Sequence, residues 1–354
     1  MNSSRTGVRA FALATRATRA KRATCATLVA LFTLVSLVAL AARYGIGAAD
    51  AQEQRHDYPS RPIKMLVGFA PGGGTDITAR IIAKKLSEQI KQQVVVENRA
   101  GGGGVLANEL TAQAAPDGYT LLLSAVGPMT VNPHIQKVRY NVERDFLPVT
   151  MAVTFPNVLV VPPSSKVTTL ADYIALAKDS TAKLAFGSSG VGGAGHLAGE
   201  LLNNLAKVSV PHIAYKGGGP AMSDLLGGQV PALFASLASA LPQIQAGRIR
   251  PIVTTGRTRA RDLPAIATVA ESGFPGYEST NWYAFVVPAK TPAAIIARLN
   301  SELGATLRAK DVLDQLAHHG MEAQPTSPDE QAKFMRREYE TWGRIVRAAG
   351  IKPE

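Results

Sequence analysis

Two glycine-rich turns limit the folds open to this chain, because each joins an apolar run to a segment with helical periodicity. The first turn, Pro71-Gly-Gly-Gly-Thr-Asp76, follows the apolar residues 64–70, and the second, residues 187–196, follows residues 183–186. Strand, turn and helix in that order form the repeating unit of α/β folds with parallel sheets. The first N–H groups of each helix lack partners within it and carry partial positive charge. Two such turns, more than a hundred residues apart, predict two half-sites that close on one small anion.

Strand and helix signals alternate along most of the chain. Thr169-Leu-Ala-Asp172 fits a capping box at a helix start, and Ser327 is a suitable N-cap before Pro328. The β-branched runs 149–161 and 282–287 are predicted to cross between two α/β lobes. Periodicity predicts strands at 63–69, 93–97, 119–124, 149–161, 210–215, 249–254 and 282–287, and helices that include 170–178, 220–226 and 328–348.

Residues 1–51 have the three parts of a secretory signal. A basic segment ends at Arg22, an uncharged apolar segment covers residues 26–42, and Ala49-Asp-Ala51 supplies the small residues that a signal peptidase reads. These residues carry half of the formal net charge of +12. We expect cleavage after Ala51 and export to the periplasm. The alternative is an uncleaved membrane anchor, because the apolar segment is long for a signal.

The rest of the chain indicates neither a metal nor nucleic-acid binding. The sole cysteine, Cys25, precedes the apolar segment of the signal, so the mature chain is expected to have no disulfide and no thiol chemistry. Its six histidines are dispersed without metal-ligand spacing. It contains no dense run of lysine and arginine.

The second turn matches the dinucleotide-binding pattern G-x-G-x-x-G at Gly190-Val-Gly-Gly-Ala-Gly195. That pattern needs an acidic residue about twenty positions later to hold the ribose, and residues 210–216 contain none. Neither turn ends in the Gly-Lys-Ser/Thr of a phosphate-binding loop. No cofactor is therefore predicted.

Several polar residues near the turns have two interpretations. Thr75 or Asp76 is expected to be a helix N-cap, and Asp76 can also receive an ammonium or hydroxyl group of a ligand. Tyr215 is either a hydrogen-bonding residue of the site or a core residue at the end of a strand. His196 is interpreted as a structural or ligand-lining residue.

An alternative function is a secreted α/β hydrolase or transferase that uses Ser188 or Ser189, with His196 nearby in the sequence. A serine nucleophile needs a positioned base and a third group that orients the base, and no spacing shows that arrangement. The chain is therefore interpreted as a binding protein and not as an enzyme.

Short motifs follow one another in a fixed order over nearly the whole mature chain. They include Tyr58-Pro-Ser-Arg-Pro-Ile63, Phe69-Ala-Pro-Gly-Gly-Gly-Thr-Asp76, Asn98-Arg-Ala-Gly-Gly102, Pro116-Asp-Gly-Tyr-Thr120, Gly187-Ser-Ser-Gly190, His196-Leu-Ala-Gly-Glu200, Tyr215-Lys-Gly-Gly-Gly-Pro220, Asp224-Leu-Leu-Gly-Gly-Gln229 and Glu271-Ser-Gly273. This ordered set resembles the Bug family, the TctC-like periplasmic receptors of tripartite tricarboxylate transporters.

The resemblance implies a two-lobed periplasmic-binding-protein (Venus-flytrap) fold, in which each lobe is a mainly parallel sheet flanked by helices. Residues 52–151 with 279–354 would form lobe 1, and residues 152–278 would form lobe 2. The expected ligand is a small molecule, often a carboxylate, held between the lobes largely by backbone groups and water. The expected partners are the membrane subunits of a tripartite transporter, and the receptor is expected to be a monomer.

One departure from the family bears on the ligand. An acidic residue is common in the family where this chain has Phe234-Ala-Ser236, so the cleft is expected to be less negative there. Aspartate, citrate, an aromatic acid and an uncharged vitamin remain open as ligands. The candidate ligand-binding residues are Ala70, Gly73, Gly74, Thr75, Asp76, Ser124, Ser188, Gly190, Gly192, His196 and Tyr215.

Overall fold

Both glycine-rich turns join a strand to a helix, as their sequences predict. The first lies between β1 (Ile63–Val67) and α2 (Gly74–Ile90). The second lies between β5 (Phe186–Ser188) and α6 (Ala194–Ala206). The α/β unit inferred from the two turns is therefore present twice.

The start of α2 differs from its prediction. The helix begins at Gly74 with Gly73 as its N-cap, so the prediction that Thr75 or Asp76 is the N-cap is wrong. The Asp76 carboxylate instead accepts a hydrogen bond of 3.0 Å from the N–H of Gly72. This bond closes the turn one residue before the cap, and the helix can then begin within the glycine run.

The computed structural model describes residues 58–349, so the predicted signal and its cleavage site after Ala51 lie outside the described residues. The further strands are β2 (Val94–Asn98), β3 (Thr120–Ala125), β4 (Phe146–Val161), β6 (His212–Ala214), β7 (Ala232–Ser236), β8 (Arg250–Thr254), β9 (Thr280–Pro288) and β10 (Glu322–Ala323).

The further helices are α3 (Val105–Ala112), α4 (Asn132–Ile135), α5 (Leu170–Lys178), α7 (Gly218–Leu226), α8 (Leu237–Gln245), α9 (Ala293–Arg308), α10 (Lys310–His318) and α11 (Pro328–Ala349), with a 3₁₀ turn η1 (Gly102–Gly104) and a π-helical turn η2 (Gly127–Val131). Within residues 58–349, none of the helices has the length and apolar character needed to span a membrane.

Local sequence signals explain two helix starts. The predicted capping box before α5 is present, because the hydroxyl of Thr169 accepts a hydrogen bond from the N–H of Asp172 and the Asp172 carboxylate accepts one from the N–H of Thr169. The N–H of Glu330 donates to the hydroxyl of Ser327 before α11, which confirms the predicted N-cap there.

The strands form one hydrogen-bonded sheet with the order β2-β1-β3-β9-β4-β7-β5-β6, and β8 and β10 also pair with β4. Strands β1, β2 and β3 are parallel, as are β5, β6 and β7. Strand β9 runs antiparallel to both β3 and β4, and β4 runs antiparallel to β7 and β8. Two parallel groups of strands are therefore joined through two antiparallel strands.

Strand β4 changes partners along its 16 residues. Residues 146–156 pair with β9, and residues 157–161 pair with β7 and β8, so the change falls between Pro156 and Asn157. We call β1–β3, β9, β10 and residues 146–156 the first sheet region, and β5–β8 with residues 157–161 the second sheet region. The two predicted crossovers correspond to β4 and β9.

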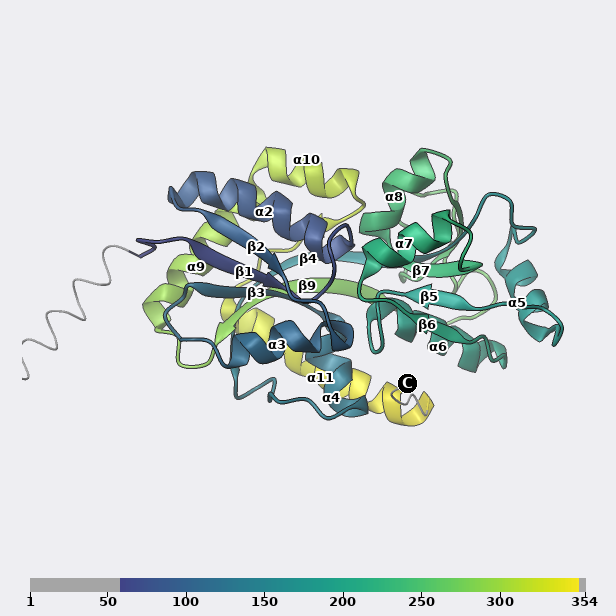
Figure 1. Cartoon of the computed structure of the whole chain (residues 1–354), viewed down its shortest axis with the longest axis horizontal. Coiled ribbons are helices and arrows are strands. Elements are labelled where there is room, and N and C mark those ends of the chain that lie inside the picture. Colours follow the sequence, from purple (N-terminus) through teal and green to yellow (C-terminus); the bar gives the residue numbers. More distant parts are fainter. Residues whose placement is uncertain (1–57, 350–354) are drawn as a thin grey trace, which may run out of the picture. The chain divides into compact units, whose positions relative to one another are not determined.

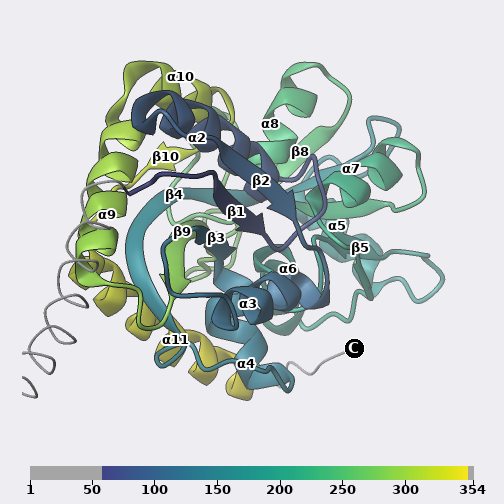
Figure 2. The same cartoon turned by 60° about the vertical axis from the view of Figure 1, so that its left-hand side comes forward.

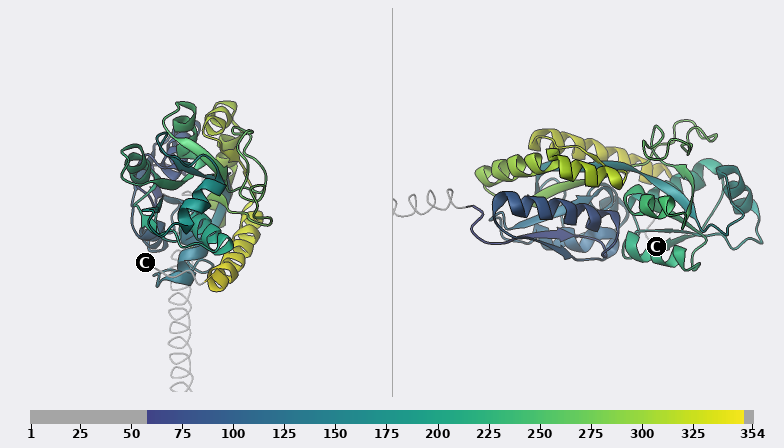
Figure 3. Two further views of the ribbon diagram at one scale, coloured as in Figure 1. Left: turned by 90° about the vertical axis from the view of Figure 1, so that its right-hand side faces the viewer. Right: turned by 90° about the horizontal axis from the view of Figure 1, so that it is seen from above.

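Helices cover both faces of the first sheet region (Figures 1 and 2). Helices α2, α9 and α10 lie side by side on one face, as the view from above in Figure 3 also shows. Helices α3, α4 and α11 cover the other face. A buried cluster on that side includes Leu66, Leu122, Val286 and Trp342, which come from β1, β3, β9 and α11.

Side-chain alternation places two cores on the second sheet region. Leu159 and Phe234 belong to the cluster with α5 and α6, whereas the neighbouring Val158 and Leu233 belong to the cluster with α7 and α8. All four side chains are at most 1% exposed. The second sheet region is therefore buried on both faces, which fixes the end of β5 that carries the second glycine turn.

Candidate ligand-binding site

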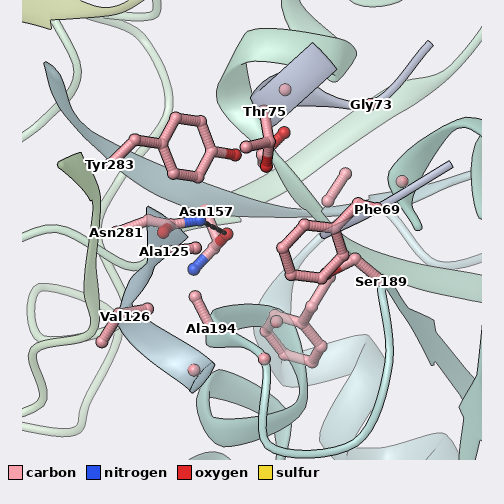
Figure 4. Close-up of a pocket in the computed structure, with 18 of the residues that line it drawn as sticks. Phe69, Gly73, Thr75, Ala125, Val126, Asn157, Ser189, Ala194, Asn281 and Tyr283 are labelled. Atoms are coloured by element: carbon pink, nitrogen blue, oxygen red, sulfur yellow. Dashed lines mark hydrogen bonds between the residues drawn. The ribbon is translucent and has the colours of Figure 1, made fainter. Parts of the chain in front are cut away.

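A pocket of about 30 Å³ lies where the ends of β1, β3, β5 and β7 meet the strands β4 and β9 (Figure 4). This volume can hold only a few water molecules. The lining residues are Phe69, Gly73, Gly74, Thr75, Ala125, Val126, Gly127, Asn157, Ser189, Gly193, Ala194, Gly195, Gly218, Leu233, Phe234, Ala235, Ser236, Asn281 and Tyr283.

Four helices begin at this pocket. Helices α2, α6, α7 and α8 contribute residues from their first turns or N-caps to the lining, and they are 17, 13, 9 and 9 residues long. None of the four N-cap residues, Gly73, Gly193, Gly217 and Ser236, makes a side-chain capping hydrogen bond. The pocket therefore receives the partial positive charge of four helix termini and their unpaired N–H groups.

None of the lining side chains is charged, so the polar groups are neutral hydroxyls and amides. Burial raises the pKa of the Tyr283 hydroxyl, although hydrogen bonds with Thr75 and Ser236 oppose the effect. The tyrosine therefore stays protonated at neutral pH and can donate a hydrogen bond. Figure 4 shows Thr75 and Tyr283 together on one side of the pocket and the amides of Asn157 and Asn281 facing each other.

Glycine allows the helix termini to approach one another. A β-carbon added to Gly74 would lie 2.7 Å from both the Ser236 and the Tyr283 hydroxyl oxygens, and one added to Gly73 would lie 3.1 Å from the backbone nitrogen of Gly218. A side chain at either glycine would push α2 away from the starts of α7 and α8. The glycines of the first turn are therefore required by close contact at the pocket.

Of the eleven residues predicted to bind a ligand, Gly73, Gly74 and Thr75 line the pocket. The other eight do not line the pocket, and all of them except Tyr215 are adjacent in the chain to a residue that does. Ser124 is buried beside the lining residue Ala125, and its hydroxyl donates to Asn108 at 3.1 Å. The N–H of Ala70 donates to the carbonyl of Lys216 at 2.9 Å.

Asp76 is 4% exposed and already has three partners. Its carboxylate accepts hydrogen bonds from Gly72, Arg80 and Asn98 at 2.9–3.0 Å. Burial alone would raise the pKa of Asp76, but the hydrogen bonds outweigh it and hold the pKa below its ordinary value. The carboxylate therefore stabilises the first turn and does not line the pocket.

Ser188 and Gly190 support the second glycine turn from behind. The Ser188 hydroxyl is completely buried, lies 2.7 Å from Nε2 of His212 and accepts the N–H of Gly190 at 3.1 Å. Burial lowers the pKa of His212 to about 4, so its ring is neutral at neutral pH. Ser189, the next residue along the turn, lines the pocket.

His196 and Gly192 form a second support of the same turn. The N–H of Gly192 donates to Nδ1 of His196 at 3.0 Å, and the His196 ring stacks on His212 with centroids 4.2 Å apart. The side chain of His196 is 2% exposed. Both residues therefore hold the loop in front of them, which reaches the pocket through Gly193 and Ala194.

The Tyr215 hydroxyl bonds to a protein side chain and not to a group of the pocket. Its hydroxyl donates to the Asp224 carboxylate at 2.9 Å, and burial together with this bond raises its pKa to about 12. Tyr215 is not among the residues that line the pocket.

The eleven candidate ligand-binding residues do not include Asn157, Ser189, Ser236, Asn281 and Tyr283, which supply most of the polar lining, although Ser189 is a candidate nucleophile in the alternative interpretation of the sequence. A signal for the two asparagines exists in the sequence. Asn157 interrupts the β-branched run 149–161, and Asn281 precedes the aromatic pair that begins the run 282–287. A buried polar residue within an apolar strand requires a partner, and that requirement marks both positions.

The family profile of the tripartite tricarboxylate transporter family receptor, TctC, matches residues 78–351. The chain belongs to this family. The TctC-family relatives include a UPF0065 protein from a Pseudomonas species, 39% identical over 84% of this chain and 89% of the relative. BugT from Bordetella pertussis is 38% identical over 83% of this chain and 91% of its own.

Solved structures agree with this assignment. The R. palustris protein Rpa4515, solved with adipate, has a TM-score of 0.81 and 34% identity over 84% of this chain and all of its own. The periplasmic binding protein BugD has a TM-score of 0.81 and 30% identity over 84% of this chain and all of its own. MatC from Rhodopseudomonas palustris, with bound malate, has a TM-score of 0.78 and 29% identity over 82% of this chain and all of its own.

The prediction of a TctC-like receptor with the two-lobed periplasmic-binding-protein fold is confirmed. The chain is a periplasmic solute receptor of the TctC family, and its family and fold are those of a binding protein.

Proposed function

We propose that this TctC-family receptor binds a small carboxylate in the pocket between its lobes and delivers it to the membrane subunits of a tripartite transporter. Lobe 1 would comprise residues 52–151 and 279–354, and lobe 2 residues 152–278. The supporting observation is the convergence of four helix termini without side-chain caps on a pocket whose lining has no charged side chain. Such a pocket attracts an anion through the backbone alone.

The energies are sufficient for a receptor. A helix terminus contributes roughly 0.3–1 kcal/mol to a nearby anion, and up to about 2 kcal/mol when partly buried. A hydrogen bond to a charged group contributes roughly 1.5–3 kcal/mol. Several such contributions, less the cost of association, reach the roughly 8 kcal/mol that micromolar binding requires.

The two similar proteins solved with adipate and malate are consistent with a carboxylate ligand. We infer that the lobes separate to admit a ligand of this size, because the described pocket has a volume of only about 30 Å³. The proposed hinge lies at residues 156–157 of β4 and at the start of β9, because within residues 58–349 these antiparallel strands join the two groups of parallel strands in the sheet. Closure would then be stabilised by contacts of the ligand with both lobes.

The proposal includes export. Cleavage after Ala51 would release a mature, monomeric receptor that begins at Gln52. Mass spectrometry of the protein from a periplasmic extract should give the mass of residues 52–354, whereas an uncleaved anchor would retain residues 1–51 in the membrane fraction.

The carboxylate proposal can be tested by a thermal-shift screen of mono-, di- and tricarboxylates, followed by calorimetry. A saturable increase in melting temperature with unaltered ligand is expected. The matched controls are the uncharged diamides of the same length. Equal stabilisation by an acid and its diamide would contradict recognition of the anion.

The hydrolase alternative has one observation in its favour, the contact of 2.7 Å between Ser188 and His212. The Ser188 hydroxyl is completely buried, however, and does not line the pocket. We therefore retain the receptor function as the proposal. Ester or amide hydrolysis that is lost in the S188A variant would overturn this choice.

A further inference from the structure

Two buried asparagines meet at the pocket. Asn157 lies where β4 changes partners and is 1% exposed, and Asn281 lies in β9 and is 6% exposed. The amide nitrogen Nδ2 of Asn281 donates a long hydrogen bond of 3.4 Å to Oδ1 of Asn157. Both side chains line the pocket and face each other in Figure 4.

Each amide keeps one group without a protein partner. Nδ2 of Asn157 and Oδ1 of Asn281 are buried from solvent and make no hydrogen bond within the described residues. If both amides were rotated by 180°, the pair would still bond and would still leave one NH₂ group and one carbonyl oxygen unpaired. Because buried polar groups are nearly always paired, this donor and acceptor mark a place for an occupant.

The occupant must both accept and donate a hydrogen bond. A hydroxyl group does both, as does the water that it would replace. A carboxylate only accepts, so it would meet the carbonyl oxygen unfavourably, and an ammonium only donates, so it would meet the NH₂ group unfavourably.

The pocket also lacks an anion that could balance an ammonium group. Ser236, the N-cap of α8, places a neutral hydroxyl in the lining. Asp76 is near in the sequence, but Arg80, Asn98 and the N–H of Gly72 already occupy its carboxylate. Four helix termini would further oppose a cation.

We infer that the site selects hydroxycarboxylates, with the hydroxyl held between Asn157 and Asn281, over acids that carry hydrogen or an ammonium group at the same carbon. This inference rests on the proposed carboxylate function and adds the identity of the second group that the pocket recognises.

Three acids with one skeleton test it. Succinate, malate and aspartate share four carbons and two carboxylates and differ at the second carbon by H, OH and NH₃⁺. Calorimetry with both enantiomers of malate should show one that binds at least about tenfold more tightly than succinate and about a hundredfold more tightly than aspartate. The five- and six-carbon series with the same three substituents cover longer ligands.

The outcomes separate the two proposals. Binding of acids in any series without preference for the hydroxyl overturns the inference and leaves the carboxylate function standing. Failure of every acid in all three series overturns both.

Variants assign the effect to the two amides. In N157A and in N281A, the ratio of succinate to malate dissociation constants should fall to within about twofold of one, and the double variant should add little. A merely structural role would weaken both acids equally and keep the ratio. The matched control is N203A, because Asn203 is a buried asparagine of α6 that bonds to Val210 and not to the pocket. An unchanged ratio in both pocket variants contradicts the inference.

A variant that introduces a carboxylate into the lining tests whether the neutral lining excludes an ammonium group. Aspartate is a favourable N-cap residue, so S236D should fold and place a carboxylate at the pocket. Its affinity for aspartate should rise at least about tenfold relative to malate. No gain in a folded S236D protein would contradict the exclusion of ammonium by the neutral lining.

Discussion

At the scale of single residues, Gly73 keeps α2 in contact with α7 at the pocket. A β-carbon there would lie 3.1 Å from the backbone nitrogen of Gly218 and 3.4 Å from its Cα atom. The neighbour is backbone at a helix start, so it has little freedom to move away. The distance between two helix termini that line the same pocket therefore depends on one missing methyl group.

The G73A variant should bind the acid with the largest thermal shift at least about tenfold more weakly, a loss of about 1.4 kcal/mol. The reason is that the added methyl separates the starts of α2 and α7, while the core strands remain intact. Calorimetry gives the affinity and urea unfolding checks the fold. The control is G304A, because a β-carbon at Gly304 in α9 meets only the Arg308 side chain. Affinity within twofold of the wild type in G73A would contradict this role.

At the scale of elements, the β5–α6 turn is held by β6. His212 in β6 contacts the Ser188 hydroxyl, and the His196 ring of α6 stacks on it. The turn reaches the pocket through Ser189, Gly193 and Gly195. Strand β6 therefore positions the β5–α6 turn, although none of its own residues lines the pocket.

This support predicts a pH dependence. The pKa of His212 is lowered by burial to about 4, against about 6.5 in the unfolded chain, so the unfolded state binds more protons between these values. The stabilising effect of the neutral ring is complete above about pH 6.5 and is lost as the pH falls toward 4. The free energy of unfolding should drop by about 2 kcal/mol more between pH 7.5 and pH 5 in the wild type than in H212Q.

Urea unfolding at the two pH values measures the difference. The exposed His318 at the end of α10 provides the control, and H318Q should keep the wild-type dependence. An identical loss of stability in H212Q and the wild type would refute the assignment to His212.

At the scale of the whole molecule, backbone contacts bring the two sheet regions together. The N–H of Ala70 donates to the carbonyl of Lys216, Gly73 lies against Gly218, and β-carbons added to Gly103 and Gly127 would meet the carbonyl oxygens of Val191 and Gly192. Gly73, Gly127 and Gly218, which take part in these contacts, also line the pocket of about 30 Å³. Under the proposed function, we expect these contacts to separate when a ligand enters.

A disulfide across these contacts tests the opening. Residues 52–354 contain no cysteine, so in a protein of these residues A70C/K216C would form the sole bridge, at positions already joined by a backbone hydrogen bond of 2.9 Å. The oxidised protein should fail to bind an acid that the reduced protein binds. K216C alone should be insensitive to oxidant. Equal binding rates in the oxidised and reduced double variant would show that the pocket fills without opening.

Much of the fold follows from local sequence, whereas the pocket does not. The bounds of α5 and its capping box, the two glycine turns and the crossovers at β4 and β9 depend on residues near one another in the chain. The pocket depends on helix starts as far apart as Gly74 and Leu237, whose meeting is decided by the order of strands in the sheet. The position of Asn281 beside an apolar run marks it as polar and buried, but neither Asn281 nor Ser236 shows from local sequence which residues it meets across the sheet.

The neutral lining has a consequence for how such receptors diversify. In the proposed receptor, attraction for the anion comes from main-chain groups, which every sequence with this backbone retains, so we expect a substitution at Asn281 or Ser236 to change which acid is preferred without removing the affinity for acids as a class. A gene duplicate can then adopt a new nutrient by altering a few side chains. Descent from one ancestor could in this way supply a bacterium with many transport specificities on a single scaffold.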